Sequence, residues 1–134
     1  MRHAAGPFEV EMQPEPNYET AEGGVVLGRV AFKKQFHGPL EAASVVQMLS
    51  AGSSVKGSAG YVAMERVVGA LDGRAGTFIL QHNATMNRGQ PTLAITVVPD
   101  TGTGDLVGLA GTMAIDIVEG QHSYRFDYTL PDAP

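Results

Sequence analysis

Four side chains able to donate, accept or polarise a proton fall among apolar residues of the chain. They are Lys34, Tyr61, Glu65 and His82. Each occupies the apolar phase of a segment in which polar and apolar residues alternate. Burial raises the pKa of a carboxyl group and lowers those of histidine and lysine, whereas pairing between them opposes both shifts. A buried cluster of this kind can hold a proton donor and a proton acceptor near neutral pH, so we predict these four as catalytic residues.

A two-residue turn at Asp72-Gly73 predicts how two of these side chains meet. Asp-Gly is a strong signal for a β-hairpin, and a hairpin closed here sets Glu65 opposite Leu80. His82 then becomes the diagonal neighbour of Glu65, within reach of a long side chain, and Tyr61 lies on the same face. The register predicts a Glu–His pair for proton transfer. A purely structural ion pair is the alternative, because buried charges usually occur paired and hydrogen-bonded.

The apolar phase of the same segments predicts the interior of the fold. We expect the buried set to be Phe8, Phe32, Phe78, Leu80, Ile95, Ile115 and Phe126. We expect the ligand-binding set to be Phe32, Phe36, Phe78, Met86, Tyr124 and Tyr128. The methionines Met12, Met86 and Met113 share this phase and suit either core filling or an adaptable apolar lumen. The opposite phase carries most of the charged residues, so each strand has one apolar and one polar face.

Glycine spacing organises the chain as short strands. Its 134 residues include 17 glycines, nearly twice the usual share of about 7%, between segments rich in Val, Ile, Thr and aromatic residues. We expect strands at residues 7–14, 25–37, 40–50, 60–71, 74–88, 92–99, 111–118 and 122–130. A short helical turn is expected within Val46–Met48 or Gly104–Gly108. His3 is expected to lie in a mobile end of the chain. One all-β domain over 1–134, with its core at about 7–130, is predicted as a sandwich or a barrel.

A glycine-rich loop links two of the expected strands, in the segment from Val98 to Ile115. Loops that cradle a phosphate need a following helix whose N-terminal amides face the anion. Here Met113, Ile115 and Ile117 alternate with polar or small residues, which indicates a strand. The glycines also lack the G-x-G-x-x-G spacing. The loop is therefore predicted to be a strand connection and not a nucleotide site.

The stretch from Gly102 to Gly111 resembles the G-T-G-x-[FL]-x-G-[AL]-x-G signature of dirigent proteins and other allene oxide cyclase-like barrels. The wider chain, over about residues 7–130, is similar to domain-of-unknown-function family 3224, a bacterial group of that superfamily. The segments that carry this likeness are Lys34–Gly38, Lys56–Tyr61, Leu71–His82 and His122–Tyr124. The resemblance implies a closed antiparallel β-barrel of about eight strands. It implies no established activity or catalytic residues, although related barrels steer cyclisations by shape and are often oligomers.

Composition excludes several classes of function. The net charge is −5 and the nine Lys and Arg residues are scattered, which disfavours nucleic acid because its backbone rewards a basic stripe. Cysteine is absent, so disulfides and thiolate chemistry are excluded. His37, His82 and His122 lack the spacing of a metal site, and we expect no metal and no cofactor. Without a signal peptide or a long apolar run, we expect a cytoplasmic protein with no membrane partner.

Two classes of function fit these residues. The first is a cofactor-independent isomerase, cyclase or lyase that moves a proton on a hydrophobic small molecule held in an apolar lumen. The second is a non-catalytic small-molecule-binding or oligomeric structural module, because a fold alone does not define a function. An open cavity of roughly 300 Å³ or more beside Glu65 and His82 favours the first class. Apolar residues on the outer phase predict a homodimer. These are Val25, Leu27, Val62, Met64 and Val68.

Overall fold

Nine β-strands account for most of the chain in the computed structural model, which describes residues 1–132. Their bounds are β1 (Arg2–Pro14), β2 (Glu19–Thr20), β3 (Val26–Phe36), β4 (Leu40–Gly52), β5 (Ala59–Leu71), β6 (Arg74–Asn87), β7 (Gln90–Val97), β8 (Ala110–Val118) and β9 (Gln121–Thr129). The helical segments of this part of the chain are two 3₁₀ turns, at Glu22–Gly24 and Gly104–Leu106. No helix within residues 1–132 is long and apolar enough to cross a membrane. The predicted all-β class is confirmed.

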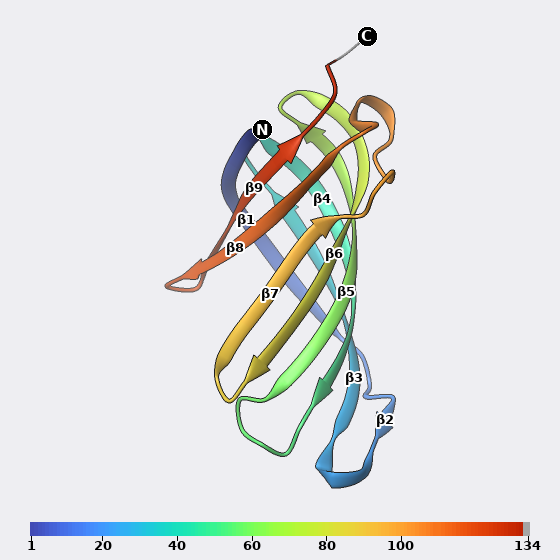
Figure 1. Cartoon of the computed structure of the whole chain (residues 1–134), viewed down its shortest axis with the longest axis vertical. Coiled ribbons are helices and arrows are strands. Elements are labelled where there is room, and N and C mark those ends of the chain that lie inside the picture. The colour runs from blue at the N-terminus through green and yellow to red at the C-terminus, as the bar shows by residue number, and fades with distance from the viewer. Residues whose placement is uncertain (133–134) are drawn as a thin grey trace.

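The strands form one antiparallel sheet that closes on itself. Neighbouring strands follow the order β1-β9-β8-β7-β6-β5-β4-β3-β2, and β1 also pairs with β3. Eight strands therefore complete the barrel, whereas β2 is a short addition beside β3 at the lower end of Figure 1. Closure removes sheet edges that a strand-rich chain would otherwise present to solvent. The prediction of a closed antiparallel barrel of about eight strands is confirmed.

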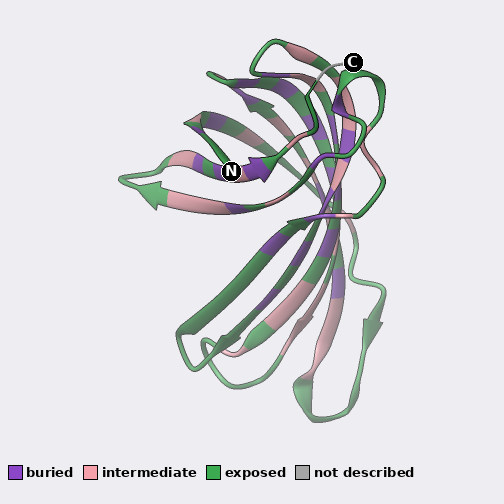
Figure 2. Cartoon of the chain, turned by 45° about the horizontal axis from the view of Figure 1, so that its top comes forward, coloured by how far each residue is buried: buried purple, intermediate pink, exposed green. Residues whose placement is uncertain are grey.

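Two-residue turns set which side chains point into the barrel. Asp72 and Gly73 have φ angles of 48° and 83°, the left-handed values that a tight hairpin turn requires. This turn pairs β5 with β6 so that Glu65 lies opposite Leu80, which makes His82 the diagonal neighbour of Glu65, as predicted. Because side chains alternate across a strand, one register decides the facing of every residue in the pair. Figure 2 shows the resulting alternation of buried and exposed segments along the strands.

Side chains fill one half of the lumen, which we call the packed half, and leave the other half open. The packed half lies where β6 begins and β9 ends, at the upper end of Figure 1. There Phe78 stacks on Phe126 with ring centroids 5.9 Å apart. Of the predicted interior residues, Phe8, Phe78, Leu80, Ile95 and Phe126 are buried, and Phe32 and Ile115 are half-buried. The two half-buried side chains lie where the packing ends, and they line a cavity in the open half.

The structure corrects one local prediction and decides two that left alternatives open. His3, expected in a mobile end, lies in β1, and its ring Nδ1 is 2.6 Å from a carboxylate oxygen of Asp127 on β9. Of the two places expected for a helical turn, Gly104–Leu106 forms one, whereas Val46–Met48 belongs to β4. Met12 and Met86 do not fill the core, since their exposed fractions are 60% and 43%, and Met86 instead lines a cavity of the lumen. Both lie near strand ends that extend beyond the packed half, where facing the lumen does not bury a side chain.

The glycine-rich loop closes the packed end of the barrel. It forms a single 3₁₀ turn between β7 and β8, and its Leu106 and Leu109 are buried against the core. The N–H of Thr77 on β6 donates to Oγ1 of Thr103 in the loop at 3.1 Å. Gly102 lies so close to the backbone of Leu106 that a side chain would not fit there. The loop is a strand connection, as predicted, because β8 and not a helix follows it.

Candidate functional site

Four polar side chains from adjacent strands meet in the lumen and form what we call the polar cluster. They are Lys34 of β3, Ser44 of β4, Glu65 of β5 and His82 of β6. Nε2 of His82 lies 2.7 Å, and Nζ of Lys34 3.3 Å, from the same oxygen of Glu65, Oε1. The Ser44 hydroxyl donates to the other carboxylate oxygen at 2.6 Å. Glu65 has an exposed fraction of 0% and is the shared partner at the centre of the cluster.

Strand pairing explains why these side chains converge. Lys34 lies opposite Ser44 in the ladder of β3 and β4. Glu65 lies opposite Val46, which is two positions further along β4 than Ser44 and on the same face. Diagonal neighbours on one face are roughly 7–8 Å apart, a distance that long side chains can span. Glu65 and His82 have the same diagonal relation across β5 and β6. Register specifies the cluster, since a one-residue slip would turn its members outward.

Glu65 is a buried carboxylate that its partners keep ionised. Burial by itself would raise its pKa. The hydrogen bond from His82, the charge of Lys34 and the hydrogen bond from Ser44 outweigh that effect, and the pKa of Glu65 lies below its usual value. The Lys34 ammonium also lies 5.1 Å from the ring centroid of Phe8, whose face attracts a cation. Lys34 and Glu65 thus place two opposite charges side by side within the lumen.

The ring of His82 is joined to Glu65 through one of its two nitrogens. Because an ionised carboxylate only accepts hydrogen bonds, Nε2 carries the proton in the bond to Glu65. In the neutral ring Nδ1 is then an acceptor, and the hydrogen bond that joins the ring to the protein within residues 1–132 is made by Nε2. His82 lines the open cavity beside the cluster. Its Nδ1 is therefore the nitrogen available to a bound molecule.

A cavity of about 390 Å³, which we call the inner cavity, opens beside the polar cluster. Lys34 and His82 of the cluster, together with Tyr61, contribute polar atoms to the wall of this cavity. The apolar lining consists of Phe8, Val10, Phe32, Val46, Met48, Ala63, Leu93, Ile115 and Ile117. This lining comes in part from β7 and β8, whose ladder among the described residues holds only the pairs Ile95–Met113 and Thr96–Thr112 before the strands diverge (Figure 1). A mostly apolar cavity with a few polar groups is typical of small-molecule sites.

Tyr61 contributes a hydroxyl to the wall of the inner cavity. Burial, and then the negative charge of Glu65, raise the pKa of Tyr61 above the usual value for tyrosine. The hydroxyl is therefore protonated at neutral pH and can donate a hydrogen bond to a bound molecule. The side chain is half-buried, as expected at the edge of an open space. Of the four predicted catalytic residues, three are thus in direct contact and the fourth lines the same cavity.

The predicted ligand-binding residues divide between the two halves of the barrel. Phe32 lines the inner cavity, and Met86 lines a second cavity at the lower end of the barrel. The other four are fully buried in the packed half: Phe36, Phe78, Tyr124 and Tyr128. Side chains so completely enclosed present no surface to a ligand. They share the lumen-facing phase with Phe32, but they lie deeper along the barrel.

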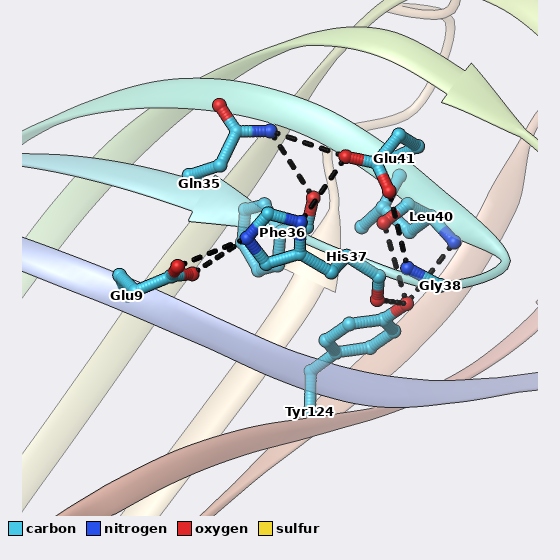
Figure 3. Close-up of polar contacts among 8 residues, drawn as sticks. All are labelled: Glu9, Gln35, Phe36, His37, Gly38, Leu40, Glu41 and Tyr124. Atoms are coloured by element: carbon cyan, nitrogen blue, oxygen red, sulfur yellow. Dashed lines mark hydrogen bonds and ion pairs between the residues drawn. The ribbon is translucent and has the colours of Figure 1, made fainter.

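Tyr124 has a structural role that its position explains (Figure 3). Its hydroxyl donates to the carbonyl oxygen of His37 at 2.8 Å and accepts from the N–H of Leu40 at 3.0 Å. Its ring meets Phe36 edge to face, with centroids 5.5 Å apart. These contacts fasten the turn between β3 and β4 to the core. The Tyr124 hydroxyl therefore holds this turn in place through its hydrogen bonds.

A second group of titratable residues surrounds His37 on the same turn (Figure 3). Its Nε2 lies 2.7 Å from Glu9 and its Nδ1 3.3 Å from Glu41. Both carboxylates are exposed and the histidine is half-exposed, so water screens these pairs. No group of three or more His, Asp or Glu within residues 1–132 is placed to hold a metal ion. This group lies outside the inner cavity, whose lining does not include it.

Sequence reasoning missed two polar residues of the site. Ser44 was not considered, although it lies on the lumen-facing phase of its strand, two positions before Val46. His122 was considered only as a metal ligand, yet it lines the inner cavity from β9. The turn at Glu119-Gly120 sets His122 opposite Ile117, and this register was readable from the sequence. Extending the hairpin argument to both strands would have found it.

The fold and the site together define a small antiparallel β-barrel whose apolar lumen is packed at one end and open, beside a buried charged cluster, at the other. Residues 4–128 match the family described as "Protein of unknown function (DUF3224)", and the chain belongs to this family. A similar solved structure is the crystal structure of a protein of unknown function from the DUF3224 family of Shewanella oneidensis MR-1. The two share 52% sequence identity with a TM-score of 0.93, over 98% of this chain and 99% of that one. No curated protein matches the chain. The predicted family is confirmed, and the allene oxide cyclase-like superfamily stays a prediction.

Proposed function

We propose that this protein is a cofactor-independent isomerase that moves a proton on an apolar small molecule bound in the inner cavity. The observation that carries this proposal is the cavity itself, at about 390 Å³, with the ring of His82 in its wall and Glu65 behind that ring. Its volume exceeds the roughly 300 Å³ needed by a small-molecule ligand. A filled lumen would have favoured the non-catalytic module instead.

In the proposed reaction, Nδ1 of His82 takes a proton from a carbon beside a carbonyl group of the ligand. Glu65 holds the ring in the required tautomer and stabilises the imidazolium that forms, since its pKa keeps it ionised. The Tyr61 hydroxyl donates a hydrogen bond to the oxygen on which negative charge develops. Return of the proton from His82 to a different carbon completes an isomerisation. The apolar lining keeps water from competing for the intermediate.

The test uses cyclohex-3-enone, a compact β,γ-unsaturated ketone whose conversion to the conjugated isomer is followed by ultraviolet absorbance. We expect the purified protein to accelerate this conversion and His82→Gln to slow it by roughly 100-fold, as loss of a general base does. His37→Gln is the matched control, because His37 lies outside the cavity. Unchanged turnover by a folded His82→Gln variant would overturn the proposed role. A wild-type protein that binds the ketone without converting it would favour the binding module.

We also propose that two copies associate through the outer face of β4 and β5. Exposed apolar side chains gather there: Val45, Leu49, Val62, Met64 and Val68. Exposed apolar side chains that gather on one face often mark a protein interface. The other two outer-phase residues predicted to favour association, Val25 and Leu27, are half-buried just before and at the start of β3.

The expected dimer is checked by light scattering at tens of micromolar protein. We expect a dimer for the unmodified chain and a monomer for Val62→Glu combined with Met64→Lys, because desolvating two charges in an apolar interface is costly. Thr96→Glu, on the exposed face of β7, is the control and should remain a dimer. A monomeric unmodified chain would exclude this association.

A further inference from the structure

We propose that the ligand is an elongated apolar molecule with one neutral carbonyl group at its inner end, and that its chain extends from beside His82, past Tyr61, to the lower end of the barrel. The inference rests on the proposed function for the placement of the carbonyl group beside His82. It adds the class of the ligand, in shape and in charge, to the reaction proposed above.

The first observation is that the inner cavity continues into a larger one. A second cavity of about 610 Å³, which we call the outer cavity, lies between the loop after β4 and the turn after β6. Met48, Tyr61 and Leu93 line both cavities, so the two meet at these side chains. The outer cavity is lined by further apolar residues of the lumen face and the loop. They include Val55, Ala59, Ala84, Met86 and Pro91.

The strands give the length of this combined space. His82 lines the inner cavity and Met86, four residues further along β6, lines the outer one. Four residues of a β-strand span about 13 Å, which is roughly the length of an extended chain of ten carbon atoms. Compact molecules would leave the outer cavity unfilled. A linear apolar chain would bury most of its surface along this path.

The second observation is the balance of charge at the inner end. Glu65 is already paired with Lys34 at 3.3 Å and accepts hydrogen bonds from Ser44 and His82. A ligand carboxylate would have to compete with Glu65 for Lys34, and burial, with the charge of Glu65, already makes ionisation of the Tyr61 hydroxyl unfavourable. A ligand ammonium would compete with Lys34 for Glu65, whose two carboxylate oxygens already have partners. A neutral carbonyl oxygen needs only a donor, which the Tyr61 hydroxyl supplies.

The far end of the path offers one alternative for a charged ligand. Among the described residues that line the outer cavity, Lys56 is the charged one, and it is exposed on the loop after β4. A carboxylate could lie there with its chain pointing inward, in the reverse orientation. Such binding would be screened by solvent and would depend on Lys56. It is an outcome that the experiment must separate from the proposal.

The experiment compares 2-undecanone, undecanoate and undecylammonium as competitors of a fluorescent apolar dye at pH 7. We expect the ketone to bind at least tenfold more tightly than either charged compound. Tighter binding of undecanoate, abolished by Lys56→Gln, would overturn the neutral end group. These affinities do not depend on turnover, so failure of the isomerase assay with cyclohex-3-enone would leave them interpretable.

Chain length is tested with 2-alkanones of increasing length. We expect affinity to rise up to roughly ten carbons, the span estimated from the strands. Ala84→Phe fills the outer cavity, so its affinity should stop rising at shorter chains. If Ala84→Phe does not fold, Met86→Trp serves the same purpose. Ala94→Phe is the control, since Ala94 is exposed on the opposite face of β7 and does not line either cavity. An identical length dependence in all variants would exclude the outer cavity as the path.

Discussion

Replacing Glu65 by glutamine is expected to lower the free energy of unfolding by about 3–5 kcal/mol, the usual cost of breaking a buried ion pair from one side. The fold and the side-chain volume are preserved, but Lys34 keeps its charge in the lumen, where only 8% of its side chain is exposed. The glutamine amide also cannot accept from all three partners at once. Denaturant unfolding at pH 7 measures the loss. Glu41→Gln, an exposed carboxylate on β4, is the control and should change stability by less than about 1 kcal/mol.

The stability lost in the Glu65→Gln variant is expected to depend on pH. The pKa of Glu65 is lower in the folded protein than in the unfolded chain, where it has its usual value of 4.5. Its ionisation therefore stabilises the fold fully above that value, and the contribution disappears as pH falls through the folded pKa. We expect the difference in unfolding free energy between wild type and Glu65→Gln to shrink as pH decreases from 7 to 3. A difference that stays constant over this range would show that Glu65 is not held ionised.

A double substitution separates stability from chemistry. Replacing Lys34 by methionine and Glu65 by leucine removes both charges, and apolar replacements of buried ion pairs are often neutral or stabilising. We expect this variant to recover most of the stability lost in Glu65→Gln. The isomerisation of cyclohex-3-enone should remain impaired, because His82 has lost the carboxylate that orients it. Recovery of both properties together would indicate that the charges of Lys34 and Glu65 have no part in the reaction.

Gly102→Ala is expected to destabilise the protein by about 3 kcal/mol, at the upper end of the usual range for overpacking. A methyl group at this position would overlap the carbonyl oxygen of Leu106 and lie 2.8 Å from its carbonyl carbon. These are backbone atoms of the loop that closes the packed half, so they cannot move aside as a flexible side chain would. Thermal or denaturant unfolding measures the effect.

Gly52→Ala is the matched control for this prediction. Nothing lies within 4 Å of the methyl group that it would add, and Gly52 is absent from the glycines of positive φ. Substitution there should be neutral or stabilise by about 0.4–1 kcal/mol, because alanine restricts the unfolded chain. Equal effects at the two positions would exclude close packing as the reason for glycine in the loop.

Much of the site could be predicted because it depends on local rules. The turn at Asp72-Gly73 and the alternation of side chains were enough to place Glu65 beside His82. The contact of Lys34 with Glu65 was harder, because it requires β3, β4 and β5 to lie side by side in one register. The sequence placed Lys34 on the lumen-facing side of its strand. It did not identify Glu65, which lies two strands away in the sheet, as the partner of Lys34.

The division of the lumen into a packed and an open half could not be predicted. Phe32 and Phe36 share one phase of β3, four residues apart, yet the first lines a cavity and the second is fully buried. Their difference depends on depth along the barrel, which is set by how far neighbouring strands extend and by the closing loop. The pairing of His3 with β9 was missed for a similar reason, since its partner lies at the other end of the chain.

The short ladder between β7 and β8 makes this boundary the weakest seam of the barrel. Regions with few backbone hydrogen bonds open at the lowest free energy, well before a protein unfolds as a whole. Amide hydrogens of residues 90–94 and 114–118 that face the seam should therefore exchange with solvent faster than those at the other boundaries between the eight strands of the barrel. We expect the seam to widen while Phe78 and Phe126 stay stacked in the packed half. Access to the lumen through this wall is thereby uncoupled from the global stability of the fold.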